Sequence, residues 1–171
     1  MTGTRLAIAA THVASAPDRW FFVHRSVPLL LTFCARNRRP TFKAVTVVDQ
    51  TLMQIRRTAR EETFAILAYC FMPDHAHLLV EGTRADSDLK RFARLAKQRS
   101  GAAFALATGR PLWQEGFHDR VLRAGEDAKA VARYIVANPV RAGLVVSPAD
   151  YSFSGSDVWT MAELIESVRE T

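Results

Sequence analysis

Two histidines in the segment YCFMPDHAHLLVEG, residues 69–82, have the spacing of a metal-binding pair. His75 and His77 are separated by one residue within an apolar run that is typical of a β-strand. Because alternate side chains of a strand share a face, the two imidazoles are expected to lie side by side. Neutral imidazoles are common ligands of divalent cations. The alternative is a pair of ordinary histidines on a half-buried strand, and the rest of the chain bears on the choice.

A tyrosine and an asparagine further along supply a candidate nucleophile and a candidate third ligand. Tyr134 and Asn138 lie four residues apart in DAKAVARYIVANPVRAGLV, residues 127–145, which places them on one face of a helix. A phenolate can attack a phosphodiester, but a phenol of ordinary pKa, about 10, needs a base or nearby cation. The amide oxygen of Asn138 beside two histidines suits Mg²⁺ or Mn²⁺ better than structural zinc. A helical tyrosine is also commonly a core or surface residue, so both interpretations stay open here.

The net positive charge of the chain is concentrated in one segment. From Arg84 to Arg141 there are 12 Lys and Arg residues against 6 Asp and Glu, whereas the rest of the chain holds 11 of each. A local excess of this kind favours a polyanionic partner, most simply nucleic acid. It weighs against a metalloenzyme that acts on other substrates. A basic surface that serves only solubility is the alternative.

Length and composition indicate a single soluble domain. The chain has 171 residues, of which 49% are hydrophobic and 23% charged, enough for a sizeable core. No apolar run reaches the roughly 18 residues that cross a bilayer, and the N-terminal LAIAA patch is too short for a signal peptide. We therefore expect a cytoplasmic protein. Cys34 and Cys70 lie in apolar runs without CxxC spacing, which favours buried reduced thiols over a zinc site.

The order of the expected elements predicts an α+β, ferredoxin-like fold. The patterns predict strands over 27–35, 64–71, 75–81 and 119–123, and helices over 45–60, from Asp86 or Ser87 to about 105, over 127–138 and over 158–169. Strand, helix, strand, strand, helix, strand is the order of a split βαβ sandwich, an antiparallel sheet with helices on one face. A turn at 72–74 joins the central strands as a hairpin, which leaves one face of the histidine strand available as a site.

Five ordered motifs of the chain resemble one family. They are TFCARNRRPTF (32–42), MPDHAHLLVEG (72–82), LKRFARLAKQRSG (89–101), PLWQEGFHDRVLR (111–123) and YIVANPVRAGLV (134–145). With these motifs the chain, from about Phe21 to Trp159, resembles the REP-associated tyrosine transposases. These are relatives of the IS200/IS605 transposases within the HUH nuclease superfamily.

The resemblance implies a metal-dependent single-strand DNA endonuclease and strand transferase. Tyr134 matches the family's nucleophile, His75 and His77 match its metal-binding pair, and Asn138 matches a polar position that completes the metal site. Such enzymes form a 5′-phosphotyrosine link and release a free 3′-hydroxyl at imperfect hairpins, with Mg²⁺ or Mn²⁺ as cofactor. The implied catalytic domain spans 21–159, between an N-terminal extension of uncertain order (1–20) and a C-terminal helical tail (160–171). Relatives include monomers and swapped dimers, so either a monomer or a homodimer is expected.

Basic and aromatic residues outside this constellation are candidate contacts to single-stranded or hairpin DNA. Arginine and lysine can bind phosphates, and the rings of Trp113 and Phe117 can stack on unpaired bases. Ordinary packing under a long loop is the alternative for both rings, and Arg141 is also placed to cap the helix that carries Tyr134. The candidate DNA-binding residues are Arg36, Arg38, Arg39, Lys90, Arg94, Lys97, Trp113, Arg120, Arg123 and Arg141.

Two rival functions share these features. A domesticated hairpin-DNA-binding protein would keep the fold and the basic surface with little or no turnover. A replication initiator or relaxase from another branch of the superfamily would usually place the tyrosine and histidines differently along the chain. Such proteins often carry a helicase domain as well, which we do not expect in 171 residues.

Overall fold

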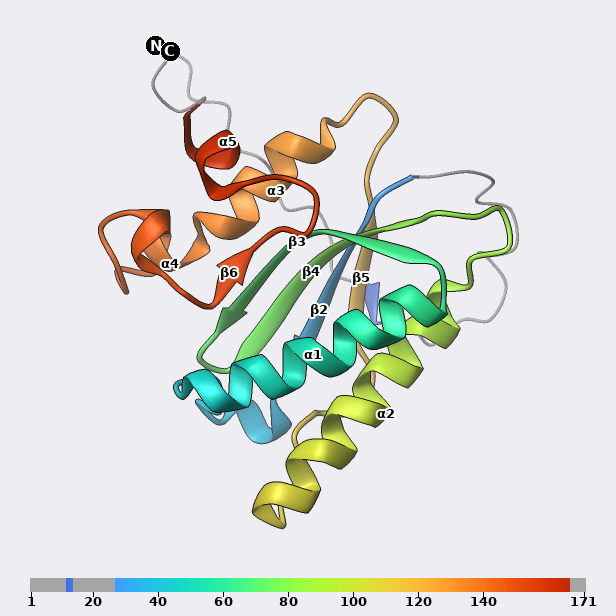
Figure 1. The fold of residues 1–171 in the computed structure, drawn as a ribbon, viewed down its shortest axis with the longest axis vertical. Helices are drawn as coiled ribbons and strands as arrows, with labels where there is room; N and C mark the ends of the chain where they lie inside the picture. The colour runs from blue at the N-terminus through green and yellow to red at the C-terminus, as the bar shows by residue number, and fades with distance from the viewer. Residues whose placement is uncertain (1–11, 14–26, 167–171) are drawn as a thin grey trace.

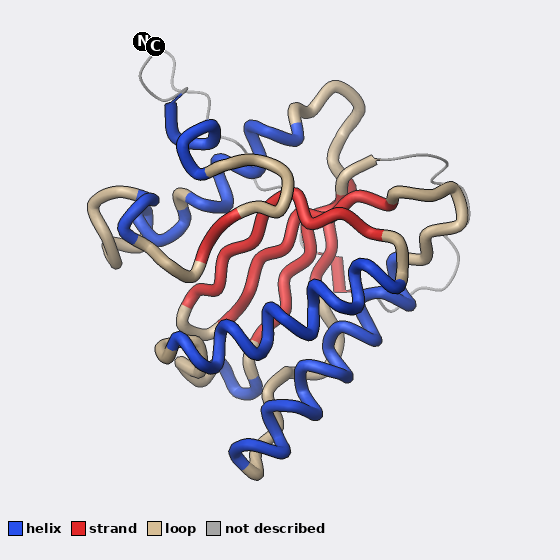
Figure 2. The backbone as a smooth tube through the Cα atoms, viewed as in Figure 1, coloured by secondary structure: helices blue, strands red, loops and turns tan. Residues whose placement is uncertain are grey.

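A six-stranded antiparallel sheet organises the computed structural model, which describes residues 12–13 and 27–166 (Figure 1, Figure 2). The strand order across the sheet is β1-β5-β2-β4-β3-β6. The strands are β1 (His12–Val13), β2 (Leu29–Cys34), β3 (Phe64–Met72), β4 (His75–Gly82), β5 (His118–Val121) and β6 (Ser154–Gly155). The helices are α1 (Val45–Glu61), α2 (Leu89–Thr108), α3 (Ala128–Val136), α4 (Asn138–Arg141) and α5 (Met161–Ile165), with 3₁₀ turns η1 (Arg36–Arg38) and η2 (Pro148–Asp150).

The path β2-α1-β3-β4-α2-β5 is the split βαβ arrangement, so the predicted α+β, ferredoxin-like class is confirmed. The predicted hairpin is present as β3 and β4, joined through the turn at Pro73 and Asp74. Central strand β4 pairs with β3 on one side and with β2 on the other. The histidine strand therefore lies in the middle of the sheet, where pairing on both sides fixes its register.

Helices α1 and α2 cover one face of the sheet, as Figure 1 shows. Each helix turns its apolar residues inward at helical spacing, for example Val48, Leu52 and Ile55 in α1. The partner side chains on β4 are Ala76, Leu78 and Val80, which are fully buried. These residues alternate with His75 and His77, so the two histidines point to the opposite face.

The opposite face carries α3 and α5 (Figure 1). Leu79 of β4 packs there in one cluster with Val131 and Ile135 of α3. The prediction of helices on one face is therefore correct for α1 and α2, whereas the shorter helices α3 and α5 pack on the opposite face. Because Leu79, His77 and His75 alternate on one strand, the histidine pair and α3 lie on the same side of the sheet.

Several predicted boundaries shift by one to three residues for identifiable reasons. Helix α2 is capped by Asp88, which accepts from the Arg91 amide, rather than by Asp86 or Ser87. The helix predicted over 127–138 begins at its Asp127 cap but ends at Val136. Pro139 lacks the N–H needed to continue it, although proline fits the first turn of α4.

The predictions for the two ends of the chain can be compared with the structure only in part. The predicted C-terminal helix begins at Met161 behind a capping box of Thr160 and Glu163, and its last predicted residues lie outside the described ones. The predicted N-terminal extension over 1–20 also lies outside them, apart from β1. Within the described ranges, no helix is long and apolar enough to cross a membrane.

Candidate metal and nucleophile site

The two histidines of β4 meet at their Nε2 atoms, which are 3.1 Å apart. Each ring is held from behind through Nδ1. His75 Nδ1 donates to the Asp74 carboxylate at 2.6 Å, and His77 Nδ1 lies 2.9 Å from the Thr32 hydroxyl oxygen. If both Nδ1 atoms carry the proton, two Nε2 lone pairs face each other, and a proton or a cation between them removes the repulsion. The pair therefore has the form of a preorganised two-imidazole metal site.

The charge states of these groups suit metal binding. Burial lowers the pKa of His77 to about 3, and the positive charges of His75, Arg141 and Arg38 act in the same direction. His77 is therefore a neutral imidazole at physiological pH, as a metal ligand must be. Burial works to raise the pKa of Asp74, but the hydrogen bond from His75 and the charges of His75 and Arg38 outweigh it and the pKa is lowered. Asp74 thus stays a carboxylate that orients His75.

Cys70 lies opposite His77 on β3 but is no ligand candidate. Cys70 is a fully buried free thiol, and Cys34 is a free thiol that is almost fully buried. Both agree with the prediction of buried, reduced cysteines. Burial raises the pKa of Cys70 to about 12, so the thiolate is not formed at neutral pH. Across the described residues there is no cluster of three or more His, Cys, Asp or Glu side chains suited to a metal. A cation at the histidine pair would therefore need its further ligands from an amide oxygen, water or DNA phosphate.

Arg141 contacts both the predicted nucleophile, Tyr134, and the predicted third ligand, Asn138. Its guanidinium carbon lies 3.7 Å from the centre of the Tyr134 ring, and its Nη2 donates to the Tyr134 carbonyl at 2.7 Å. The same nitrogen donates to Asn138 Oδ1. Its positive charge also helps to lower the pKa of His77. Tyr134, Asn138 and Arg141 thus form one cluster over the face that carries the histidines, and the predicted helix-capping role of Arg141 is realised through the Tyr134 carbonyl.

Comparison with known proteins shows the family to which the chain belongs. Residues 26–138 match the family model described as Transposase IS200 like. The chain belongs to the IS200-like transposase family. It is also 30% identical over 138 residues to the REP-associated tyrosine transposase of Escherichia coli K12, an alignment that covers 79% of this chain and 74% of the relative.

Solved structures support the same placement. A REP-associated tyrosine transposase bound to a REP hairpin matches with a TM-score of 0.68 and 26% identity, over 82% of this chain and 81% of the other. A candidate transposase from Deinococcus radiodurans R1 matches with a TM-score of 0.52 over 75% of this chain and 92% of the other. At 16% identity, the second likeness shows the fold alone.

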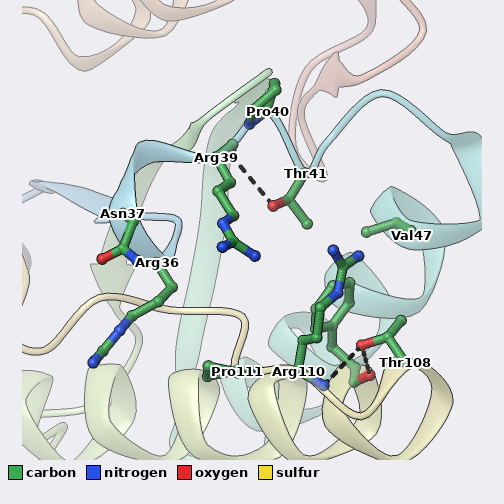
Figure 3. Close-up of a pocket in the computed structure, with 10 residues that line it drawn as sticks. Arg36, Asn37, Arg39, Pro40, Thr41, Val47, Thr108, Arg110 and Pro111 are labelled. Atoms are coloured by element: carbon green, nitrogen blue, oxygen red, sulfur yellow. Dashed lines mark hydrogen bonds between the residues drawn. The ribbon is translucent and has the colours of Figure 1, made fainter.

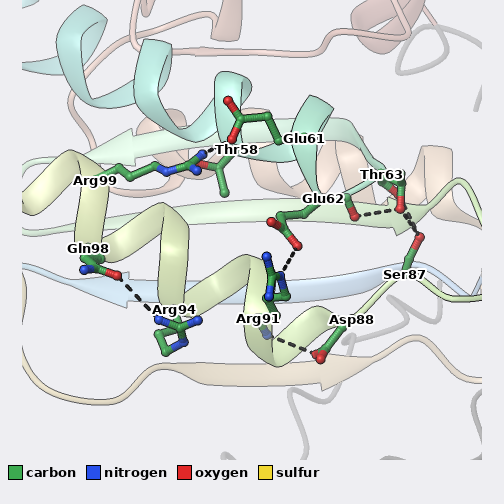
Figure 4. A network of polar contacts seen from close by, with 10 residues as sticks. All are labelled: Thr58, Glu61, Glu62, Thr63, Ser87, Asp88, Arg91, Arg94, Gln98 and Arg99. Atoms are coloured by element: carbon green, nitrogen blue, oxygen red, sulfur yellow. Dashed lines mark hydrogen bonds and ion pairs between the residues drawn. The ribbon is translucent and has the colours of Figure 1, made fainter.

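The basic residues of this transposase-family chain differ in how far the fold already engages them. On α2, Arg91 and Arg99 form ion pairs with Glu62 and Glu61, which join α2 to the end of α1 (Figure 4). Arg94, one of the predicted DNA contacts, lies beside Gln98 on the same helix (Figure 4). The predicted contact Lys97 instead donates to the carbonyl of Gln114 at 2.6 Å and to that of Gly116. Lys97 therefore anchors the loop before β5 instead of extending into solvent.

The remaining predicted contacts fall into two groups. Arg120 is held by a two-pronged ion pair with Glu126 at 2.8 and 2.9 Å, and Arg38 is paired with Asp74 at 3.3 Å. Exposed positions without an ion pair among the described residues are Arg36, Arg39, Lys90 and Arg123. The structure thus leaves those four guanidinium and ammonium groups available for phosphates.

Trp113 is not available to stack on a DNA base. It is only 9% exposed, its ring packs on Phe33 and Phe42, and its indole N–H donates to the Ser100 hydroxyl at 2.9 Å. The loop that contains it forms a bridge with Ala35 at the end of β2, which draws the indole into the core under α2. Phe117 is likewise packed against Phe33. The predicted base-stacking role of Trp113 is therefore corrected to a core role.

Trp113→Phe tests this correction. The variant keeps an aromatic ring in the core but loses the hydrogen bond to Ser100, so we expect the free energy of unfolding to fall by about 1 kcal/mol in urea titrations. The affinity for a single-stranded oligonucleotide should stay within twofold of the original protein. A large loss of affinity at unchanged stability would restore Trp113 as a DNA contact.

Two residues of the site escaped prediction. Asp74 precedes His75 directly in the PDHAH motif, and its carboxylate was a readable signal for an orienting group. Thr32 reaches His77 only because β2 pairs with β4 in a register that places the two residues opposite each other. That register depends on the whole sheet and leaves no mark on the local sequence.

Proposed function

We propose that this chain is a metal-dependent endonuclease and strand transferase that cuts single-stranded DNA beside a hairpin. The convergence of the two Nε2 atoms, each ring oriented by its own partner, is the observation that carries the proposal. The family membership supports transposase chemistry, and the solved relative bound to a REP hairpin supports a hairpin as substrate.

The residues present fit a divalent cation, Mg²⁺ or Mn²⁺. His75 Nε2 and His77 Nε2 would hold it, with Asn138 Oδ1 as the third protein ligand once Arg141 shares or releases that oxygen. When bound there, the cation supplies polarisation of the scissile phosphate and stabilisation of the charge that develops on it. Thr32 and Asp74 keep the imidazoles aimed at the same point and fix their tautomers.

Tyr134 is the proposed nucleophile. Its phenol oxygen attacks the phosphorus, its proton passes to solvent, and the bond between phosphorus and the 3′-oxygen breaks. The leaving oxygen takes up a proton and becomes a free 3′-hydroxyl, while the 5′-phosphate stays on the tyrosine. Attack by another 3′-hydroxyl reverses the step and joins a new strand. The Arg141 guanidinium lies over the Tyr134 ring and holds it through a cation–π contact.

A covalent-adduct assay tests this function. The protein is incubated with an end-labelled hairpin oligonucleotide that carries a single-stranded flank, with Mg²⁺, Mn²⁺ or EDTA. We expect a labelled band that survives denaturation, that migrates with the protein and that forms only with a divalent cation. Tight hairpin binding without any adduct or cut strand would favour the domesticated DNA-binding protein instead.

Thr32→Val tests the orienting role of the threonine hydroxyl. Valine keeps the shape of the side chain but removes the partner of His77 Nδ1, so we expect Mn²⁺ affinity to fall by about 10–100-fold in titrations without DNA. Thr83→Val is the matched control, because its hydroxyl bonds the Thr63 carbonyl at the far end of β4. Equal Mn²⁺ affinity in both variants would remove Thr32 from the site.

A further inference from the structure

A basic hollow of about 620 Å³ lies between the turn that follows β2 and the C-terminal end of α2 (Figure 3). It shares no residue with the histidine and tyrosine cluster. Among the residues that the structure describes, no acidic side chain lines it. Its lining residues are Arg36, Asn37, Arg39, Pro40, Thr41, Val47, Phe104, Thr108, Arg110 and Pro111.

Three arginines of this hollow have no acidic partner among the residues that the structure describes. Arg36, Arg39 and Arg110 make no ion pair there, whereas neighbouring Arg38 is paired with Asp74. Figure 3 shows Arg39 and Arg110 extending their guanidinium groups into the space between the turn and α2, while Arg36 points away from them. Two unpaired guanidinium groups that approach one space from opposite walls repel each other, and an anion between them removes that cost.

The walls that carry these arginines are fixed by backbone hydrogen bonds. The Arg36 amide donates to the Leu112 carbonyl at 2.8 Å, which ties the turn to the segment after α2. Phe42 donates to the Pro73 carbonyl at 2.9 Å, on the other side of the turn. Gly109 ends α2 with a φ of 71°, and its amide donates back to Ala105, so the chain reverses there and directs Arg110 toward the hollow. The backbone positions that carry the arginines are therefore held in place.

The remaining lining suits a nucleoside. Pro40, Val47 and Pro111 add apolar surface on different sides of the hollow, and the Thr41 hydroxyl, which donates to the Arg39 carbonyl, can still accept from a base edge. Guanidinium planes add stacking surfaces for unpaired bases. The turn that forms one side of the hollow is linked to the metal site, because Cys34 at the end of β2 pairs with His75 and Arg38 of η1 binds the same Asp74 that orients His75.

We propose that this hollow holds one unpaired nucleotide of the DNA strand that enters or leaves the metal site. Arg39 and Arg110 bind its phosphate, and its base contacts the apolar lining residues. The inference rests on the proposed function for the identity of the strand, and it adds Arg110 to the residues that bind DNA.

Binding of a fluorescein-labelled five-nucleotide single strand tests the pocket, with fluorescence anisotropy read between 50 and 200 mM salt. R39A/R110A is compared with R60A/R84A, which removes the same charge from exposed arginines elsewhere. All four arginines are exposed, so the core stays intact in both variants.

We expect R39A/R110A to lose at least tenfold in affinity, and R60A/R84A to keep an affinity close to that of the original protein. The slope of log affinity against log salt should fall by about 0.7, the value for one phosphate of single-stranded DNA, because both arginines bind the same phosphate. An abasic five-mer should bind the original protein more weakly than the normal strand, and free ATP should not displace the strand at equal concentration.

The outcomes separate this inference from the proposed function. Equal losses in the two double variants, no binding by the original protein, equal binding of the abasic strand, or displacement by ATP would each overturn the pocket as a DNA-nucleotide site. The hairpin adduct assay is run in parallel. Pentanucleotide binding that needs Arg39 and Arg110, without any adduct, rejects the proposed function but keeps the pocket. Adduct formation without pocket-dependent binding rejects the pocket alone.

Discussion

Tyr134→Phe will remove DNA cleavage and covalent attachment, with a loss of at least about 1,000-fold, while hairpin affinity changes by less than about twofold. The phenyl ring keeps the contact with Arg141 and the packing of α3, but it has no oxygen to attack the phosphorus. Denaturing gels measure the adduct, and anisotropy measures hairpin binding on the same preparation.

Tyr69→Phe is the matched control for this prediction. Tyr69 packs with the core under α1 and α2, on the side of the sheet opposite the histidines. Its replacement by Phe removes one phenol oxygen, as Tyr134→Phe does. Cleavage by this variant should stay close to that of the original protein. Cleavage that persists in Tyr134→Phe would exclude Tyr134 as the nucleophile.

His75→Ala combined with His77→Ala will abolish divalent-cation binding and lower the rate of cleavage by at least about 100-fold. Both Nε2 atoms that lie 3.1 Å apart are lost, and the described part of the chain holds no cluster of three or more His, Cys, Asp or Glu side chains suited to a metal. Mn²⁺ titration followed by electron paramagnetic resonance measures binding without DNA. Hairpin affinity in EDTA should be unchanged, because the pair is not proposed to bind DNA directly.

One result would contradict the metal-binding role of His75 and His77. If the double variant binds Mn²⁺ as tightly as the original protein, the cation site lies elsewhere. Thermal unfolding serves as the folding control, since His77 is neutral in the folded state and its removal leaves no buried charge unpaired. A cooperative transition in the variant therefore separates loss of the site from loss of the fold.

The sequence predicted the main fold because its signals are local. Apolar spacing identified the helix that became α1, and the apolar runs with a breaker-rich turn identified the β3–β4 hairpin. The two-residue strands β1 and β6 were missed, because two residues carry no periodic pattern. The position of α3 on the other face also could not be predicted, since it depends on which apolar surface remains uncovered after α1 and α2 pack.

The geometry of the candidate site was predictable where alternation along a strand determined it, as for His75 and His77, which share a face. Tyr134 and Asn138 share a neighbour in Arg141, but they lie on two helices, since α3 ends at Val136 and α4 begins at Asn138. Long-range features were beyond the sequence: the contact of Thr32 with His77 needs the sheet register, and Lys97 was assigned to DNA although the fold places it on loop carbonyls. A basic side chain cannot reveal from its own position whether a carbonyl or a phosphate will be its partner.

Mass spectrometry of the trapped adduct identifies the residue that is joined to DNA. The protein is incubated with a flanked hairpin oligonucleotide and Mn²⁺, denatured, digested with nuclease and protease, and searched for a peptide that carries a nucleotide. We expect a 5′-phosphonucleotide on Tyr134, absent in EDTA, together with a released strand whose 3′-hydroxyl a polymerase can extend. A nucleotide on any other residue, or cut DNA with a free 5′-phosphate and no linked peptide, would contradict it.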